Sequence, residues 1–168
     1  TDGLEWTTDN DPVFSSTGDW DSILQLPHSL EALEDGGFQL WYTGYDGDTY
    51  RIGSAITDSP SLATATFLPV SGAADDFLFG PGVPGSFDDS GVKDPAILQK
   101  DDTTYMLYSG FDGEFWHIGL ARLENGEWIP TGSMTGDTVN PVLTGQPRTF
   151  SASGVESPVV LPEWGADS

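Results

Sequence analysis

Short runs of β-branched and aromatic residues, separated by clusters of Gly, Pro, Asp and Asn, make up most of the chain. Runs of this length with turn residues at both ends are typical of β-strands, whereas few windows show the periodicity of an amphipathic helix. In the first half the pattern predicts strands over residues 28–33, 38–43, 49–56 and 63–70. In the second half it predicts strands over residues 94–99, 104–109, 115–123 and 127–130.

The two sets of strands belong to a sequence repeat. Residues 42–55, YTGYDGDTYRIGSA, recur without a gap at 108–121 as YSGFDGEFWHIGLA, 66 positions later (108 minus 42). The positions identical in both copies are Tyr42/Tyr108, Gly44/Gly110, Asp46/Asp112, Gly47/Gly113, Ile52/Ile118, Gly53/Gly119 and Ala55/Ala121. A period this long indicates a repeat architecture, and four antiparallel strands in each unit are typical of a β-propeller blade.

Partial copies of the unit flank the two full ones. Residues 4–6 resemble 126–128, which predicts a closing strand at about 3–7, and residues 155–161 resemble 92–98, which predicts an opening strand at about 155–162. With full blades at about 27–70 and 92–131, the chain holds about two and a half blades. Closed propellers have about 4–8 blades. We therefore expect either a fragment of a longer protein or a chain that pairs with another chain.

Composition narrows the choice of partners. The 168 residues include 27 Asp and Glu but 5 Lys and Arg, a net charge of −22. Such a surface repels nucleic acids and anionic membranes, while it suits solubility, calcium binding or salty surroundings. The chain has no Cys, which excludes disulfides and thiolate metal sites. No apolar run approaches the roughly 20 residues of a membrane span. Acidity without Cys fits a secreted or extracellular protein.

The sequence contains two short motifs at the predicted starts of inner strands, Asp94-Pro95 and Glu156-Ser157-Pro158. They resemble the Asp-Pro and Glu-x-Pro motifs of the five-bladed β-propeller glycosidases, the arabinanase, levansucrase and invertase group that includes glycoside hydrolase families 43, 32 and 68. The resemblance implies an all-β, five-bladed propeller. It also implies that Glu156 is the general acid and that Asp94 orients the sugar and tunes the acid. Glycoside cleavage needs such an acid, together with a carboxylate that activates water or attacks carbon.

The catalytic base of that group has no counterpart here. Residues 27–31, which begin the first full blade, contain no Asp-Pro pair, and Asp11-Pro12 corresponds to the connection at Asn140-Pro141. The base is therefore expected outside this chain, from a partner, or not at all. The leading interpretation is part of a glycoside hydrolase acting on an oligo- or polysaccharide. The alternative is a non-catalytic glycan-binding or self-assembling module of an acidic extracellular protein, in which two copies close the ring as a homodimer.

Five further residues are candidates for carbohydrate binding. In a blade that runs in, out, in and out, the loops at 44–48 and 110–114 return to the face where the inner strands begin. This face would bring rings and charges to a pocket mouth, and the candidates there are His28, Lys93, Trp116, Phe111 and Tyr45. His28 aligns with Lys93 and Glu156 at an inner-strand start. The alternatives are a structural role for the histidine, blade packing for the rings and a surface position for the lysine.

The sequence indicates no dedicated metal or cofactor site. His28 and His117 are the only histidines and do not form a zinc-binding pattern. Residues 9–11 and 46–48 have acidic groups that could offer oxygen ligands to calcium, although neither matches an EF-hand loop. The repeated Asp-Gly pairs are also ordinary turn residues. We therefore expect no cofactor, with calcium as the open alternative.

Overall fold

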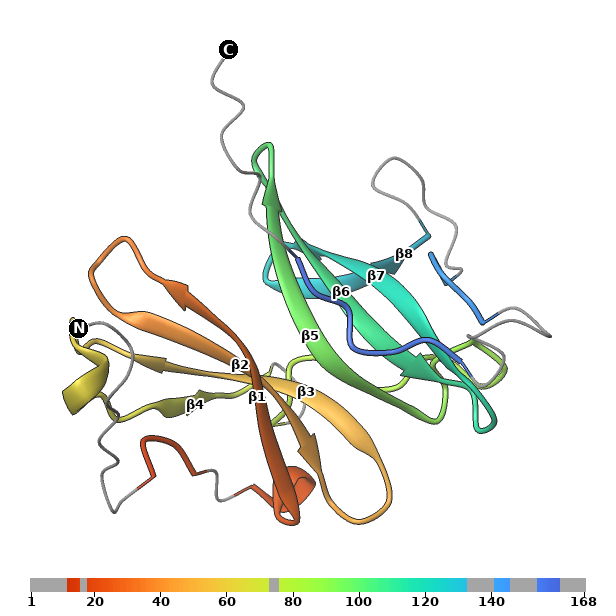
Figure 1. The fold of residues 1–168 in the computed structure, drawn as a ribbon, viewed down its shortest axis with the longest axis horizontal. Coiled ribbons are helices and arrows are strands. Elements are labelled where there is room, and N and C mark those ends of the chain that lie inside the picture. The colour runs from red at the N-terminus through yellow and green to blue at the C-terminus, as the bar shows by residue number, and fades with distance from the viewer. Residues whose placement is uncertain (1–11, 16–17, 73–75, 133–140, 146–153, 161–168) are drawn as a thin grey trace, which may run out of the picture.

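The computed structural model describes residues 12–15, 18–72, 76–132, 141–145 and 154–160 as an all-β structure (Figure 1). Two four-stranded antiparallel sheets each follow the order of the chain. The first comprises β1 (Leu24–Ala32), β2 (Phe38–Tyr45), β3 (Tyr50–Thr57) and β4 (Leu68–Val70). The second comprises β5 (Gly91–Lys100), β6 (Thr103–Phe111), β7 (Trp116–Glu124) and β8 (Glu127–Thr131). Two short 3-10 turns, η1 (Asp19–Asp21) and η2 (Leu62–Thr64), complete the described elements.

One predicted strand is largely wrong. Residues 62–64 form η2, and only 68–70 of the predicted strand over 63–70 pair with β3. The hydroxyls around η2 bond locally, since Ser59 Oγ donates to the Ser61 carbonyl and the Thr64 N–H bonds to the same carbonyl. Local hydrogen bonds of this kind compete with a strand ladder.

The inner strand β1 begins earlier than predicted. It starts at Leu24 and passes through Pro27, where the sequence pattern suggested a boundary. The register with β2 shifts between Pro27 and Ser29. Proline is tolerated at an edge strand or a bulge because it cannot donate to the ladder, and β1 is both an edge strand and irregular at this point.

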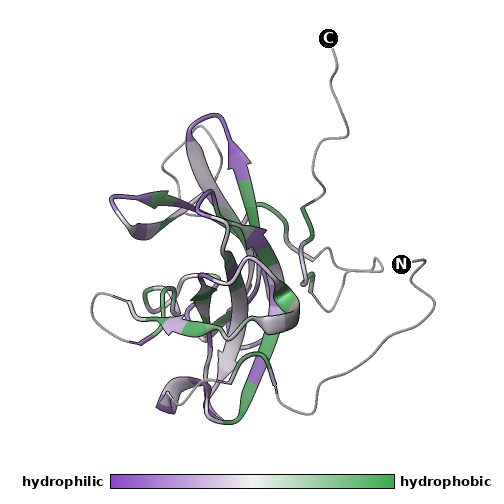
Figure 2. Cartoon of the chain, turned by 90° about the vertical axis from the view of Figure 1, so that its left-hand side faces the viewer, coloured by the Kyte–Doolittle hydropathy of each residue, from purple (hydrophilic) through white to green (hydrophobic). Residues whose placement is uncertain are grey.

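The main hydrophobic core lies where β5 packs against β1, β2 and β3. Trp41 and Ile52 of the first sheet meet Val92, Met106 and other buried residues of the second. Figure 2 shows hydrophobic residues within the strands and hydrophilic residues at several hairpin ends. Burial of these side chains holds the two sheets together and fixes β5, the edge strand of the second sheet, against the first sheet.

The repeated tyrosine makes the same buried contact in both sheets. Tyr42 donates its hydroxyl to Asp21 Oδ2 at 3.0 Å, and Tyr108 donates to Asp88 Oδ2 at 2.7 Å. Both carboxylates are buried, three residues before the inner strand begins. Burial and the neighbouring Asp88 raise the pKa of Tyr108 far above its ordinary value, so its hydroxyl remains a donor.

The repeated Gly44 and Gly110 make room for these aspartates. A Cβ at Gly44 would lie 2.5 Å from the Cβ of Asp21, and one at Gly110 would lie 2.6 Å from the Cβ of Asp88. No side chain fits at such distances without displacing the aspartate. Glycine is therefore needed at this position of each copy because the segment before the inner strand presses on β2 or β6.

The repeated Asp-Gly pairs form turns. Asp46 Oδ1 accepts hydrogen bonds from the N–H groups of Asp48 and Thr49, and Asp112 Oδ1 accepts them from Glu114 and Phe115. The glycines that follow have φ of 104° and 94°. The N–H of Thr49, and also the Arg51 guanidinium, hold the pKa of Asp46 at about 2. The turn interpretation therefore accounts for both pairs.

The sequence also predicted a partial strand near each end of the chain, at about 3–7 and 155–162. The closing strand at 3–7 lies outside the described residues, as does the acidic group at 9–11. The structure assigns no strand to 155–160, although Gly154 forms a parallel bridge with Trp116 and the Val155 N–H bonds to the Trp116 carbonyl. The strand over 155–162 therefore stays a prediction. Among the described residues, no helix has the length and hydropathy needed to span a bilayer.

Candidate functional site

A bulge in the inner strand β5 creates the centre of the site. The pairing of β5 with β6 shifts between Lys93 and Ala96, so Asp94 and Pro95 are left out of the regular ladder. Asp94 has φ of 56°, a conformation that is uncommon for a residue other than glycine. Such conformations persist only where surrounding contacts enforce them and are often found at functional sites.

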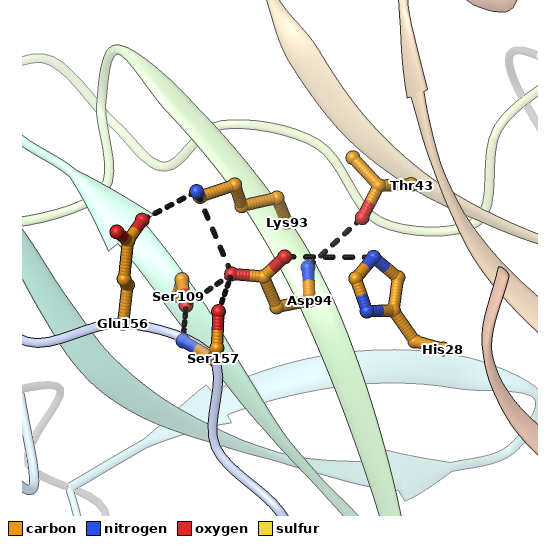
Figure 3. A network of polar contacts seen from close by, with 7 residues as sticks. All are labelled: His28, Thr43, Lys93, Asp94, Ser109, Glu156 and Ser157. Carbon is orange, nitrogen blue, oxygen red and sulfur yellow. Dashed lines mark hydrogen bonds and ion pairs between the residues drawn. The ribbon is translucent and has the colours of Figure 1, made fainter. Parts of the chain in front are cut away.

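The carboxylate of Asp94 is buried and held mainly through one oxygen (Figure 3). Oδ2 accepts hydrogen bonds from Ser109 Oγ at 2.9 Å and Ser157 Oγ at 3.1 Å, and lies 3.6 Å from Lys93 Nζ. Oδ1 faces His28 Nε2 at 3.4 Å. One oxygen is therefore fixed by the protein, while the other retains acceptor capacity toward the cavity beside it.

Lys93 connects the two carboxylates that the sequence motifs single out. Its Nζ lies 2.5 Å from Glu156 Oε2 and 3.6 Å from Asp94 Oδ2. These oxygens are therefore no farther apart than the sum of the two distances, 6.1 Å. The Glu156 side chain is 49% exposed, whereas that of Asp94 is 6% exposed. The structure thus brings together one accessible carboxylate and one buried carboxylate around a shared ammonium group.

Three hydroxyl residues of the site were not predicted from the sequence: Thr43, Ser109 and Ser157. Thr43 Oγ1 accepts the backbone N–H of Asp94 at 2.9 Å, and Ser109 Oγ accepts that of Ser157 at 2.8 Å. Thr43 and Ser109 are equivalent in the repeat, at positions 66 apart (109 minus 43). The sequence feature that could have identified Thr43 and Ser109 is a hydroxyl residue at the same position of both copies of the repeat.

His28 reaches the site from the first sheet, but its predicted alignment is wrong. Leu26 pairs with Thr43, and Lys93 pairs with the equivalent Ser109. Leu26 is therefore the counterpart of Lys93, and His28 lies beyond it. Both inner strands contain a bulge here, which comparison of their sequences did not locate.

The surroundings of His28 favour its neutral form. Burial lowers the pKa of His28 below 6.5; the Asp94 carboxylate raises it and the Lys93 ammonium lowers it. The Nε2 contact with Asp94 therefore joins a carboxylate to an imidazole that is neutral near pH 7. Such a ring has one donor and one acceptor nitrogen, which suits hydrogen bonding to hydroxyl groups of a ligand.

Four aromatic rings lie at the hairpin ends next to this cluster. Phe111 stacks on Trp116 with ring centroids 4.8 Å apart, and Tyr45 stacks on Tyr50 at 4.3 Å. Tyr50 meets Trp116 edge-on at 6.0 Å, which joins the two pairs. Lys93 Nζ lies 4.2 Å from the centre of the Trp116 ring, a cation–π contact. The rings predicted at the pocket mouth therefore meet the carboxylate cluster through Trp116.

A cavity of about 170 Å³ opens beside Asp94. Its lining includes His28, Asp94, Ser157, Pro158 and Val159. In the described part of the chain, no three His, Cys, Asp or Glu residues are grouped as metal ligands. Asp46, one of the calcium candidates, uses its carboxylate on backbone N–H groups and Arg51.

Sequence comparison identifies relatives without an assigned activity. No family model matches the chain. An uncharacterized protein of Mycobacterium tuberculosis, found in two strains, is 29% identical over 106 residues, which cover 60% of this chain and 33% of the relative. The chain thus spans about a third of the length of these relatives.

Comparison with solved structures identifies the fold. A candidate glycoside hydrolase from Parabacteroides distasonis is 18% identical with a TM-score of 0.58, covering 92% of this chain and 45% of that protein. Fructan 1-exohydrolase IIa from Cichorium intybus is 18% identical with a TM-score of 0.53, covering 73% and 22%. β-1,2-Mannobiose phosphorylase from Listeria innocua is 20% identical with a TM-score of 0.51, covering 80% and 34%. The two sheets therefore have the fold of β-propeller blades.

Proposed function

We propose that this chain forms part of a glycoside hydrolase that cleaves an oligo- or polysaccharide, with Glu156 as the general acid. The observation that carries the proposal is the meeting of Glu156 and Asp94 on Lys93, although Glu156 and Asp94 are 62 residues apart (156 minus 94). The propeller fold of the solved carbohydrate-active neighbours supports it.

Each carboxylate has a separate role in this proposal. Glu156, the exposed one, transfers a proton to the glycosidic oxygen as the bond to the sugar carbon breaks. Because Glu156 is the ion-pair partner of Lys93 in the structure, it takes up a proton from solvent before each turnover. After the transfer, the Lys93 ammonium, 2.5 Å away, stabilises the carboxylate that remains. Asp94 uses Oδ1 to accept a hydrogen bond from a sugar hydroxyl, because Oδ2 is already occupied by protein donors. The second carboxylate that the reaction needs, which activates water or attacks carbon, is supplied outside the described residues.

The remaining groups contribute to sugar binding. His28 lines the cavity beside Asp94 and provides a donor and an acceptor to hydroxyl groups. Trp116 and Phe111 form an apolar wall next to Lys93, and Tyr45 extends the aromatic row through Tyr50. Aromatic faces combined with carboxylates suit the apolar faces and hydroxyl edges of sugars.

The test is hydrolysis of a panel of plant, fungal and bacterial glycans by the natural polypeptide that carries this sequence. Glu156→Gln keeps the shape of the side chain but cannot donate a proton as an acid, so kcat should fall by about 10²–10⁴-fold with sugar affinity largely retained. Asp94→Asn should weaken both binding and turnover. Glu127→Gln, at an exposed position on β8, is the matched control and should change neither.

The outcomes separate the enzyme from its alternative. Unchanged turnover in Glu156→Gln would remove this residue from the role of acid. Glycan binding without hydrolysis by the wild type would instead favour the non-catalytic binding module.

A further inference from the structure

Each blade has a buried hydroxyl that reaches across to the next inner segment. Thr43 on β2 accepts the N–H of Asp94 at 2.9 Å, and Ser109 on β6 accepts the N–H of Ser157 at 2.8 Å. Both hydroxyl residues are fully buried and occupy the same position in the repeat. The contact therefore recurs from the first blade to the second, and from the second blade to the segment that follows it.

The two residues that donate these N–H groups share an unusual backbone conformation. Asp94 has φ of 56° and Ser157 has φ of 59°, and each precedes a proline. A residue at such a φ is held there only by its surroundings. The hydroxyl gives its N–H a partner at the point where the strand ladder is interrupted.

Ser109 also connects the two recipients to each other. A serine hydroxyl has one proton and two lone pairs. Its proton goes to Asp94 Oδ2 at 2.9 Å, while a lone pair accepts the N–H of Ser157. The result is a directed chain from the Ser157 backbone through Ser109 to Asp94. Hydrogen bonds arranged in series reinforce one another in a buried setting.

This series of hydrogen bonds affects the position of Glu156, because Glu156 is the residue before Ser157. The Glu156 side chain is 49% exposed and its described hydrogen-bond partner is Lys93. Its backbone is held by the residues on either side, Val155, whose N–H bonds to the Trp116 carbonyl, and Ser157, whose N–H bonds to Ser109. Loss of the Ser109 hydroxyl would leave the Ser157 N–H without its acceptor and would remove one of the two hydroxyl donors to Asp94 Oδ2, the other being Ser157 Oγ. The first change would affect the position of Glu156 and the second that of Asp94, so both would alter the distance between the two carboxylates.

We propose that Ser109 is a positioning residue that sets the placement of Glu156 relative to Asp94, and that Thr43 sets Asp94 in the same way from the neighbouring blade. The proposal rests on the proposed function of the site for its effect on turnover. The geometric part, in which a hydroxyl on one blade fixes a residue before proline in the next, does not depend on that function.

The experiment compares Ser109→Ala with Ser109→Thr in the natural polypeptide. Threonine is the residue that the first blade uses at this position, so Ser109→Thr keeps the hydroxyl and should rescue the defect. Ser54→Ala is the matched control, because Ser54 is equally buried and its hydroxyl accepts from Gln39 away from the site. The readouts are a crystal structure of each variant and kcat and KM measured separately on a hydrolysed glycan.

In Ser109→Ala we expect Ser157 to leave its positive φ and Glu156 to move away from Asp94. A misplacement of about 1 Å can cost on the order of 100-fold in rate, so kcat should fall by about 10- to 100-fold with a smaller change in KM. Ser109→Thr should restore both the geometry and kcat. Thr43→Val keeps the branched shape without the hydroxyl and should displace Asp94. If Ser109→Ala does not fold, the structure and kcat of Thr43→Val provide the test of the positioning role.

The two proposals fail in different ways. If Ser109→Ala keeps the wild-type geometry and kcat, or loses no more kcat than Ser54→Ala, the positioning role is overturned while the hydrolase proposal stands. If the wild type cleaves no glycan but Ser157 and Glu156 still shift in Ser109→Ala, the hydrolase proposal fails and the positioning role is supported.

Discussion

Replacing Tyr108 with phenylalanine tests the buried contact that anchors each blade. The substitution removes one oxygen and leaves the ring contacts intact, with Phe79 at 4.8 Å and Phe87 at 6.1 Å. The substitution removes the 2.7 Å hydrogen bond to Asp88 Oδ2. Asp88 is only 1% exposed, and its other oxygen, Oδ1, still accepts a hydrogen bond from the Ser86 hydroxyl. The change therefore isolates the hydroxyl–carboxylate contact.

The expected loss can be estimated from the type of bond. Hydrogen bonds to charged groups contribute about 1.5–3 kcal/mol, and a buried acceptor left without its donor adds to the cost. We expect Tyr108→Phe to lower the free energy of unfolding by about 2 kcal/mol. For a protein of 150–250 residues this corresponds to a decrease in Tm of roughly 4–8 °C.

The assay is urea unfolding followed by tryptophan fluorescence, with the midpoint and slope compared between variants. Tyr50→Phe is the control, because Tyr50 is half-buried and its hydroxyl has no hydrogen-bond partner among the described residues. We expect that variant to stay within about 0.5 kcal/mol of the wild type. Equal stability of Tyr108→Phe and the wild type would refute the anchoring role of the pair.

The same pair makes a prediction at alkaline pH. The pKa of Tyr108 is raised on folding by burial and by Asp88. Its contribution is therefore fully present below the unfolded pKa of about 10 and lost as the pH rises above it, since the unfolded chain can release the proton. Tyr108→Phe should lose this part of the alkaline decline in stability, and an identical decline in both proteins would contradict the reasoning.

Two further predictions concern carboxylates and a histidine. The pKa of Asp46 is about 2 in the folded protein against 3.8 ordinarily, so its stabilising effect is present above 3.8 and lost as the pH falls toward 2. Asp46→Asn should flatten the acid decline of stability in this window, and an equally steep decline would contradict it. By NMR titration, His28 should show a pKa below 6.5 that falls further in Asp94→Asn, because the carboxylate raises it. An increase in that variant would show that the Asp94 charge does not act on His28.

The sequence pattern predicted the blades well because each hairpin carries its own signals. The copies at 42–55 and 108–121 contain two strands and an Asp-Gly turn, and these elements depend on local contacts. Of the strand predicted over 63–70, only 68–70 forms, as β4, because local hydroxyl bonds of Ser59 and Thr64 compete with pairing before it. Strand propensity alone does not weigh such competition.

The candidate site was only partly predictable, since its decisive contacts join distant segments. Asp94 and Glu156 were identified from short motifs, whereas the hydroxyls of Thr43 and Ser109 resembled ordinary polar positions in a strand. The buried carboxylate of Asp88 was likewise missed, because it lies in a turn-like segment where aspartate is common. Burial and long-range pairing gave these residues their roles.

The most direct test of the proposed site is a crystal structure of the natural polypeptide, as the Glu156→Gln variant, with a bound oligosaccharide. The account predicts a sugar hydroxyl on Asp94 Oδ1, a sugar face against Trp116 and the glycosidic oxygen within hydrogen-bond distance of the side chain at 156. A sugar bound elsewhere on the propeller, or one that leaves Asp94 and residue 156 untouched, would contradict it.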